Sequence, residues 1–191
     1  MPEPRFEVAP LAAGEPLDGE LVRAVLSGDD RAYRPLVRRY KDVLYRYAER
    51  MTGRPDDATD IVQKAFIKGY RNLEACRDPE KVGGWLFRIT VNLCKDHLKS
   101  RHRRDVPLDT VTGLADDSAA ETAAERAELR EEIYRALQQL SLEQREAFVL
   151  KHVEGWSYEE MSEKLNVSVS ALKMRVHRAR DELQVLLKRY K

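Results

Sequence analysis

The chain has 191 residues, which is enough for one domain of average size or two small ones. Charged residues make up 35% of it, and it has neither a run of ~18 apolar residues typical of a transmembrane helix nor the basic start and apolar core of a secretory signal. Two cysteines, Cys76 and Cys94, are too few for a disulfide framework and have no metal-ligand spacing, so we expect a protein of the reducing cytoplasm.

The net charge of +1 hides an uneven distribution of charge along the chain. Residues 1–104 hold 21 Lys and Arg against 16 Asp and Glu, whereas residues 105–191 hold 13 against 17. Within these halves, residues 95–104 carry five basic side chains and one acidic one, and residues 173–180 carry four basic ones and no acid. Two separate basic clusters indicate a polyanion contacted at two points, although either cluster alone also fits a solvated helix face.

The first part of the chain predicts a mobile tail and, from residue 55 onward, a long amphipathic helix. Residues 1–19 contain four prolines and two glycines, which is typical of a mobile tail. Residues 55–57 (Pro-Asp-Asp) then supply a helix start. The apolar residues that follow recur at the spacing of one helix face: Ala58, Ile61, Val62, Ala65, Phe66, Gly69 and Leu73.

A second helix is expected to begin at Trp85, after the breaker Gly83-Gly84. Its apolar stripe consists of Trp85, Leu86, Ile89 and Leu93, which we expect to face the core. Residues 105–122 carry five acids and no basic residue or helical period, and they predict a flexible acidic linker.

The C-terminal part predicts a helical hairpin. A third apolar stripe runs through Leu129, Ile133, Ala136, Leu137 and Leu140, and Ser141 can cap the helix after it. Residues 157–160 (Ser-Tyr-Glu-Glu) form a capping box, and residues 166–168 (Asn-Val-Ser) predict a tight corner with Ser168 as the next cap. The final helix carries apolar residues at spacings of three and four from Val169 onward. A short helix, a tight turn and a basic second helix fit either a helix-turn-helix or a plain helical hairpin.

The predicted fold class is all-α, with two small helical domains joined by the linker. No stretch alternates strictly enough for a sheet. The expected domains are residues 20–104 and 123–191, after a tail of 1–19 and on either side of the linker 105–122.

These motifs resemble those of a known family. Residues 156–162 and 172–180 resemble region 4 of the bacterial sigma-70-family initiation factors, above all the short extracytoplasmic-function (ECF, group 4) class. This signature also fits the helix-turn-helix of response regulators. Residues 57–70 resemble sigma region 2.2, and residues 85–98 resemble regions 2.3 and 2.4, in the order that the family requires. A response regulator would need an α/β receiver domain upstream.

The resemblance implies a sigma factor that binds core RNA polymerase and directs it to −10 and −35 promoter elements, helping the DNA to open. It transfers the polymerase-binding role to seven residues: Asp57, Asp60, Ile61, Gln63, Lys64, Phe66 and Lys68. Ile61 and Phe66 lie on the apolar stripe, so the polar members are the better candidates for direct contact.

The same resemblance assigns −10 recognition to the helix from Trp85 and to the loop 75–84 before it. The candidate residues are Arg88, Asn92, Lys95, Asp96, Lys99, Arg101, Arg103 and Arg104. Asn92 is the candidate base reader and the cations follow phosphates, while the loop captures unstacked bases.

Recognition of the −35 element is assigned to the last helix and its cap. The candidate residues are Ser168, Ser170, Ala171, Lys173, Met174, Arg175 and Arg178. The helical period turns Ser170, Ala171, Met174 and Arg178 away from the apolar stripe, with Lys173 and Arg175 on its flanks.

No catalytic role, cofactor, metal site or small-molecule substrate is expected, because the four histidines do not cluster with Cys or carboxylates and no Gly-rich phosphate loop is present. The family usually adds an anti-sigma factor as partner, one that can hold the sigma factor at the membrane and away from the nucleoid. A stand-alone helix-turn-helix regulator and a helical adaptor are the alternatives.

Overall fold

The computed structural model describes residues 14–102 and 120–188. All regular elements within these two ranges are helical, as expected for an all-α fold. The chain divides into an N-terminal unit, residues 1–49 with 55–97, and a C-terminal unit made of the remaining residues.

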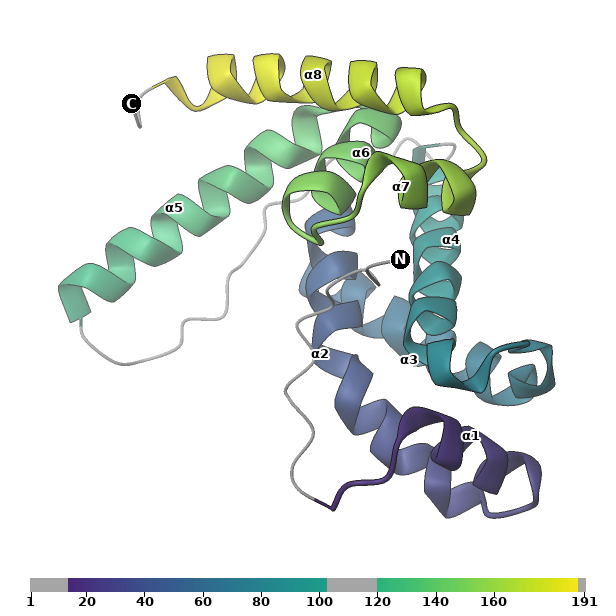
Figure 1. Cartoon of the computed structure of the whole chain (residues 1–191). Helices are drawn as coiled ribbons and strands as arrows, with labels where there is room; N and C mark the ends of the chain where they lie inside the picture. The colour runs from purple at the N-terminus through teal and green to yellow at the C-terminus, as the bar shows by residue number, and fades with distance from the viewer. Residues whose placement is uncertain (1–13, 103–119, 189–191) are drawn as a thin grey trace. The chain divides into compact units, whose positions relative to one another are not determined.

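The N-terminal unit is built from four α-helices, which Figure 1 shows from purple to teal; the C-terminal ends of the second and fourth fall in the other unit. They are α1 (Asp18–Leu26), α2 (Tyr33–Thr52), α3 (Pro55–Arg71) and α4 (Val82–His102). Three short 3-10 turns join them: η1 (Asp30–Ala32) before α2, and η2 (Leu73–Ala75) and η3 (Pro79–Lys81) between α3 and α4.

Helix α3 forms where the sequence places its start signals. Pro55 occupies the first helical position, where a missing N–H costs nothing, and Asp56 and Asp57 follow in the first turn beside the positive end of the helix dipole. The expected apolar stripe is confirmed, because its members from Ala58 to Gly69 are all buried and Leu73 is buried in η2.

The core of the N-terminal unit forms where α2, α3 and α4 meet. Tyr33 of α2 donates a hydrogen bond from its hydroxyl to the backbone oxygen of Phe66, at 2.9 Å. Burial raises the pKa of Tyr33 well above its ordinary value, which keeps this donor protonated. Tyr47 of α2 packs against Phe87 of α4 with ring centroids 4.7 Å apart. Gly69 lets α3 and α4 approach, because a Cβ there would lie 2.5 Å from Leu86 Cδ2.

Helix α4 differs from its prediction in two ways. It begins at Val82, so Gly83 and Gly84 lie inside its first turn and do not break it. Its buried face consists of Val82, Leu86, Phe87, Thr90, Val91 and Cys94. The expected stripe was therefore wrong except for Leu86: Trp85, Ile89 and Leu93 are only partly buried. The helix carries apolar residues around more than half of its circumference, and packing against Tyr47 turns Phe87 inward.

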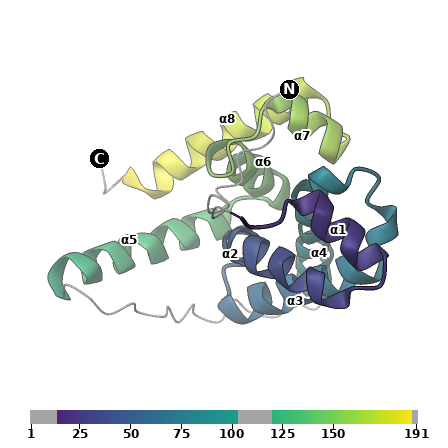
Figure 2. The ribbon, with the colours of Figure 1, turned by 60° about the horizontal axis from the view of Figure 1, so that its bottom comes forward.

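The C-terminal unit contains α5 (Ala120–Gln139), α6 (Leu142–His152), α7 (Tyr158–Leu165) and α8 (Val169–Leu186), with α8 packed on α6 and α7 (Figure 2). Its caps agree with the sequence. Ser141 and Gln144 form a capping box at α6, and Ser157 and Glu160 form another at α7. Asn166 ends α7 in the left-handed conformation at φ 54°, which asparagine tolerates. The Ser168 hydroxyl then accepts a hydrogen bond from the Ala171 N–H at 3.3 Å.

The core of the C-terminal unit is built mainly by α6, α7 and α8. Its largest fully buried side chain is Trp156, which lies between α6 and α7. Helix α8 contributes Leu172, Val176, Ala179 and Leu183. The stripe expected on α5 was only half right: Ala136, Leu137 and Leu140 are buried, whereas Leu129 and Ile133 are 39% and 40% exposed. Leu129 and Ile133 lie further from the turn into α6, toward the start of α5.

The expected segment boundaries shift slightly. Residues 1–13 and 103–119 lie outside the described ranges, so most of the tail and linker is not described. Residues 18–19 of the expected tail lie in α1, and residues 120–122 of the expected linker lie in α5. In the part of the chain that is described, no helix is both long enough and apolar enough to span a membrane.

Candidate polymerase-binding and nucleic-acid surfaces

The outward face of α3 brings together most of the residues expected to bind polymerase. Asp60, Gln63, Lys64 and Lys68 are exposed, and Lys64 Nζ lies 3.5 Å from Asp60 Oδ2. Ile61 and Phe66 are only 2% and 8% exposed. They fill the core beneath the face, as their place on the apolar stripe suggested, and the exposed polar members stay the candidates for direct contact.

Asp57 lies at the edge of this face and is shared with α4. Its Oδ2 atom is 3.2 Å from His97 Nε2, and both side chains are partly buried. Asp57 is therefore held by α4 and orients the start of α3 as well as bordering the surface.

Ile67 is a member of the α3 face that sequence reasoning missed. Its side chain is 45% exposed, one turn beyond Gln63 and Lys64. A branched apolar side chain held in water among polar neighbours is typical of a contact surface. The sequence feature that could have identified Ile67 is its position on the polar side of α3, away from the apolar stripe.

Four residues expected to contact −10 DNA share one face of α4. Arg88, Asn92, Lys95 and Lys99 follow one another at helical spacings of four, three and four residues. Arg88, Asn92 and Lys99 are exposed, Lys95 is partly buried, and Asp96 is exposed beside them. An amide between cations suits a surface that reads a base and grips the phosphates around it. We call Arg88, Asn92, Lys95 and Lys99 the α4 stripe.

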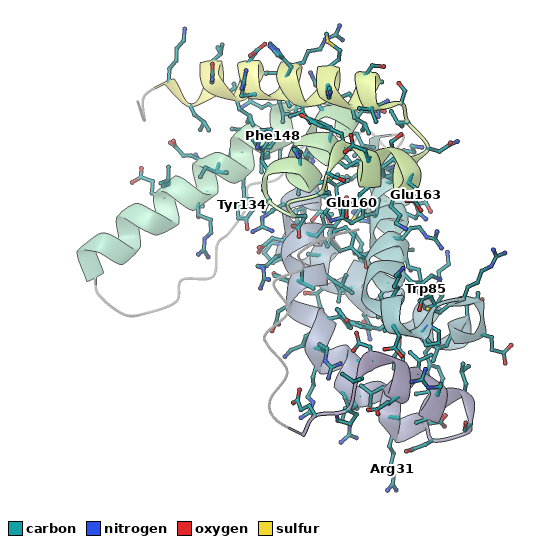
Figure 3. The ribbon with its side chains drawn as sticks, viewed as in Figure 1. Arg31, Trp85, Tyr134, Phe148, Glu160 and Glu163 are labelled. Atoms are coloured by element: carbon teal, nitrogen blue, oxygen red, sulfur yellow. The ribbon has the colours of Figure 1, made fainter. Side chains whose placement is uncertain are left out.

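Trp85 begins the same row, three residues before Arg88. It is partly exposed beside the loop that joins α3 to α4 (Figure 3). One edge of its ring packs over α3, where a Cβ at Gly69 would lie 3.6 Å from Trp85 Cζ3. A partly exposed aromatic ring is a candidate for stacking on an unpaired base, which uses the face of the ring.

The remaining −10 candidates are less fully defined. Arg101 lies in the last turn of α4, and Arg103 and Arg104 lie outside the described residues. The expected loop 75–84 is more regular than predicted, because η3 and the first turn of α4 take up residues 79–84. Its irregular part is 76–78, where Cys76 is buried and donates from Sγ to the Asp78 backbone oxygen at 3.3 Å.

Helix α8 presents the expected −35 candidates to solvent. Ser170, Lys173, Met174 and Arg178 are exposed, and Met174 is 53% exposed. Ala171 and Arg175 are partly buried at the margins, so Ala171, which was expected to point away from the apolar stripe, is less exposed than Ser170 and Met174. Ser168 is exposed at the cap, 3.2 Å from the Ser170 hydroxyl. This surface can enter a DNA major groove, which admits an α-helix.

Two further residues, Tyr158 and Lys151, extend the α8 surface, and sequence reasoning missed both. Tyr158, the first residue of α7, has Lys151 Nζ 4.7 Å and Lys173 Nζ 5.7 Å from its ring centroid. Lys151 Nζ also donates to the Trp156 backbone oxygen at 3.1 Å. The ring therefore holds two ammonium groups at the flank of α8, where a phosphate backbone would pass if α8 lay in a groove.

Lys151 and Arg180 both place positive charge near His152. The pKa of His152 lies below its ordinary value because of burial first, and then because of repulsion from Lys151 and Arg180. On α8 itself, His177 Nδ1 lies 2.7 Å from Asp181 Oδ2, so an acidic side chain lies at this edge of the basic surface.

Within the described residues, no group of three or more His, Cys, Asp or Glu side chains is placed to hold a metal ion. The described surfaces present cations, amides, hydroxyls and apolar side chains to solvent.

Comparison with known proteins matches two segments of the chain to family models. Residues 36–104 match the model of "Sigma-70 region 2", and residues 130–183 match that of "Sigma-70, region 4". RNA polymerase sigma-H factor of Pseudomonas aeruginosa is 34% identical over 180 residues, covering 89% of this chain and 93% of that protein. ECF RNA polymerase sigma factor SigW of Bacillus subtilis is 33% identical, covering 87% and 95%.

Two solved structures are similar over most of the chain. CnrH, in complex with the cytosolic domain of CnrY, has a TM-score of 0.65 and 30% identity, covering 91% of this chain and 99% of CnrH. The sigma factor RpoE of Bartonella quintana, in complex with the anti-sigma factor NepR, has a TM-score of 0.64 and 26% identity, covering 83% and 98%. The chain therefore belongs to the sigma-70 family, among the ECF RNA polymerase sigma factors.

Proposed function

We propose that this chain is a transcription initiation factor that binds core RNA polymerase through the exposed face of α3. The α4 stripe contacts −10 DNA, and the exposed surface of α8 reads the −35 element. One observation carries the proposal. This ECF family member presents three surfaces of different chemistry to solvent: the α3 face, the α4 stripe and the α8 surface.

The α3 face has the mixed character of a protein contact surface. Its charges partly balance, since Lys64 and Asp60 pair, and Ile67 supplies exposed apolar area. Protein interfaces combine an apolar centre with polar surroundings, whereas a surface for DNA needs a clear excess of cations.

The α4 stripe and the α8 surface have that excess. On α4, Asn92 is the candidate base reader and Trp85 a candidate stacking platform, with Arg88, Lys95 and Lys99 on phosphates. On α8, Arg178 is the candidate for a two-bond contact with guanine, and Met174 can favour only an apolar partner such as a thymine methyl. Lys151 and Lys173 around Tyr158 suit a phosphate beside the groove.

The decisive experiment measures promoter binding with and without core polymerase. A promoter is first selected from a genomic library by run-off transcription with the reconstituted holoenzyme. We expect the free chain to shift this fragment weakly in a gel, and the holoenzyme to bind it tightly and to transcribe from it.

The alternatives give different outcomes in the same experiment. A stand-alone helix-turn-helix regulator would support no run-off transcription in the selection, but it would bind fragments of the library tightly without polymerase. A helical adaptor would support no transcription and would bind no fragment, with or without polymerase. Either result would contradict the proposal.

We also propose that the chain has an anti-sigma factor as regulatory partner, supported by its similarity to RpoE, whose structure contains one. In this role the protein is a binding factor without catalytic activity of its own. It acts at the nucleoid in the cytoplasm when released, and a membrane-anchored partner would hold it away from DNA.

A further inference from the structure

Helix α1 has a notch that receives a side chain from the segment between α3 and α4. Gly19 is buried on α1, and a Cβ at this position would lie 1.9 Å from Glu80 Oε1 and 2.3 Å from Glu80 Cδ. One turn further along α1, both terminal nitrogens of Arg23 donate to the same Oε1 atom at 3.3 Å. The Glu80 carboxylate therefore rests on bare backbone and is held there by a guanidinium.

The start of α1 is fixed in turn to α2. The Asp18 carboxylate accepts hydrogen bonds from the side chains of Arg39 and Tyr40. Arg39 also donates to the Pro16 backbone oxygen at 3.0 Å. Both partners on α2 are largely shielded from solvent, so this end of α1 is better anchored than an exposed ion pair would make it.

Tyr40 carries the same connection to the start of α4. Its ring lies against Gly83, where a Cβ would be 2.4 Å from Tyr40 Cε1. The segment that leads into the α4 stripe is therefore held at two points, Glu80 in η3 and Gly83 in α4. Each point depends on a glycine. Glu80 lies against Gly19 of α1, and Gly83 lies against Tyr40, which bonds Asp18 of α1.

The held segment is the one expected to capture unstacked bases. Its exposed residues, among them Arg77 and Asp78, lie between the buried Cys76 and the first turn of α4. An element that catches flipped bases must be fixed before binding, because ordering it during binding subtracts from affinity.

We infer that α1 is a brace for promoter opening: the notch formed by Gly19 and Arg23 positions Glu80, and thereby fixes the segment 76–84 for capture of −10 bases. This inference rests on the proposed function and adds to it a role for a helix that lies before the matched region 2, which begins at residue 36. Gly19, Arg23 and Glu80 are positioning residues that touch no DNA base.

Two substitutions remove the contact in opposite ways. Gly19→Ala fills the notch with a methyl group and expels the Glu80 carboxylate, which is the mobile end of a flexible side chain. Alanine also favours a helix more than glycine does, so α1 itself is not weakened. Glu80→Ala removes the carboxylate and leaves the notch empty. Glu80→Gln keeps an acceptor oxygen for Arg23 and serves as the conservative variant.

The test uses holoenzyme assembled from core polymerase and the full chain, on the selected promoter with 2-aminopurine in its −10 element. Because an exposed ion pair contributes modestly, we expect Gly19→Ala and Glu80→Ala each to lower the opening equilibrium about two- to fivefold. The double variant should be no worse than either single one, since both remove the same contact. Glu80→Gln should recover part of the loss.

Core affinity and binding to a duplex that carries only the −35 element should stay at wild-type values, and the melting temperature should not fall. The matched control is Glu131→Ala, which breaks the exposed ion pair with Arg135 on α5 and should leave opening unchanged. Wild-type opening in both single variants would overturn the brace. An equal loss of opening, core affinity and melting temperature would show a purely structural contact and would also overturn it. Failure of the wild-type holoenzyme to transcribe would instead contradict the proposed function.

Discussion

Individual glycines show how much the role of one residue depends on its neighbours in space. Gly83 and Gly84 are adjacent in the sequence and lie in the same turn of α4, yet only Gly83 has a side chain against it. The doublet indicates a helix break when read alone. In the folded protein the first glycine makes room for Tyr40, whereas a methyl group added to the second would meet no other atom within 4 Å.

Alanine at these two positions should have opposite effects on the free energy of unfolding. Gly83→Ala forces a methyl group against the buried Tyr40 ring and should destabilise the N-terminal unit by about 1–3 kcal/mol. Gly84→Ala meets no atom and should stabilise it by up to about 0.5–1 kcal/mol through helix propensity. Denaturant unfolding followed by Trp85 fluorescence in a Trp156→Phe background measures both. Equal changes in the free energy of unfolding would show that the Tyr40 ring moves aside without cost, which would contradict the prediction.

Met174 and Arg178 give a residue-level test of the −35 surface. Arg178→Ala should cost about 1–3 kcal/mol at its cognate base pair and relax preference there. Met174→Ser should shift preference at one position, because it replaces an apolar contact with a hydroxyl. Selection of −35 sequences with each mutant holoenzyme measures both effects. If both variants keep the wild-type preference, another side of α8 faces the groove.

At the scale of elements, the sequence predicts helices well where their signals are local. The caps Ser157, Asn166 and Ser168 and the α8 stripe lie within a few residues of the structure that they determine. Helix α1 was missed because prolines precede it and only Leu21, Val22 and Val25 mark its buried side. The buried face of α4 was misjudged because two apolar stripes compete on it, and a contact with a distant helix, Tyr47 against Phe87, decides between them.

The basic cluster within residues 95–104 should act through charge alone. Replacing Lys99, Arg101, Arg103 and Arg104 with Ala should weaken promoter binding by the holoenzyme and flatten its salt dependence by about one unit of slope for each phosphate that is no longer neutralised. Sequence preference should barely change, because phosphates carry no sequence information. Asn92→Ala is the matched comparison, with altered −10 preference or opening and an unchanged slope. If the quadruple variant keeps the wild-type salt dependence, these four side chains contact no phosphate and are simply solvated, which would contradict the prediction.

At the scale of the whole molecule, the chain should separate into two helical fragments under limited proteolysis. Residues 105–122 hold five acids and no apolar period, so a protease specific for acidic residues should cut there first. Mass spectrometry of the early products locates the cuts, and circular dichroism of the fragments measures their helix content. First cleavage within α3 or α8 would contradict the division into two modules.

The anchoring of α1 has a consequence for anyone who recombines such proteins. The matched region 2 begins at residue 36, inside α2, so a chimera designed on that boundary would replace or discard everything before it. Such a graft would carry Arg39 and Tyr40 without Asp18, and it would leave behind the buried side chains of Leu21, Val22 and Val25. A transferable cassette should therefore start no later than residue 15, because Glu15 lies 3.7 Å from Arg39.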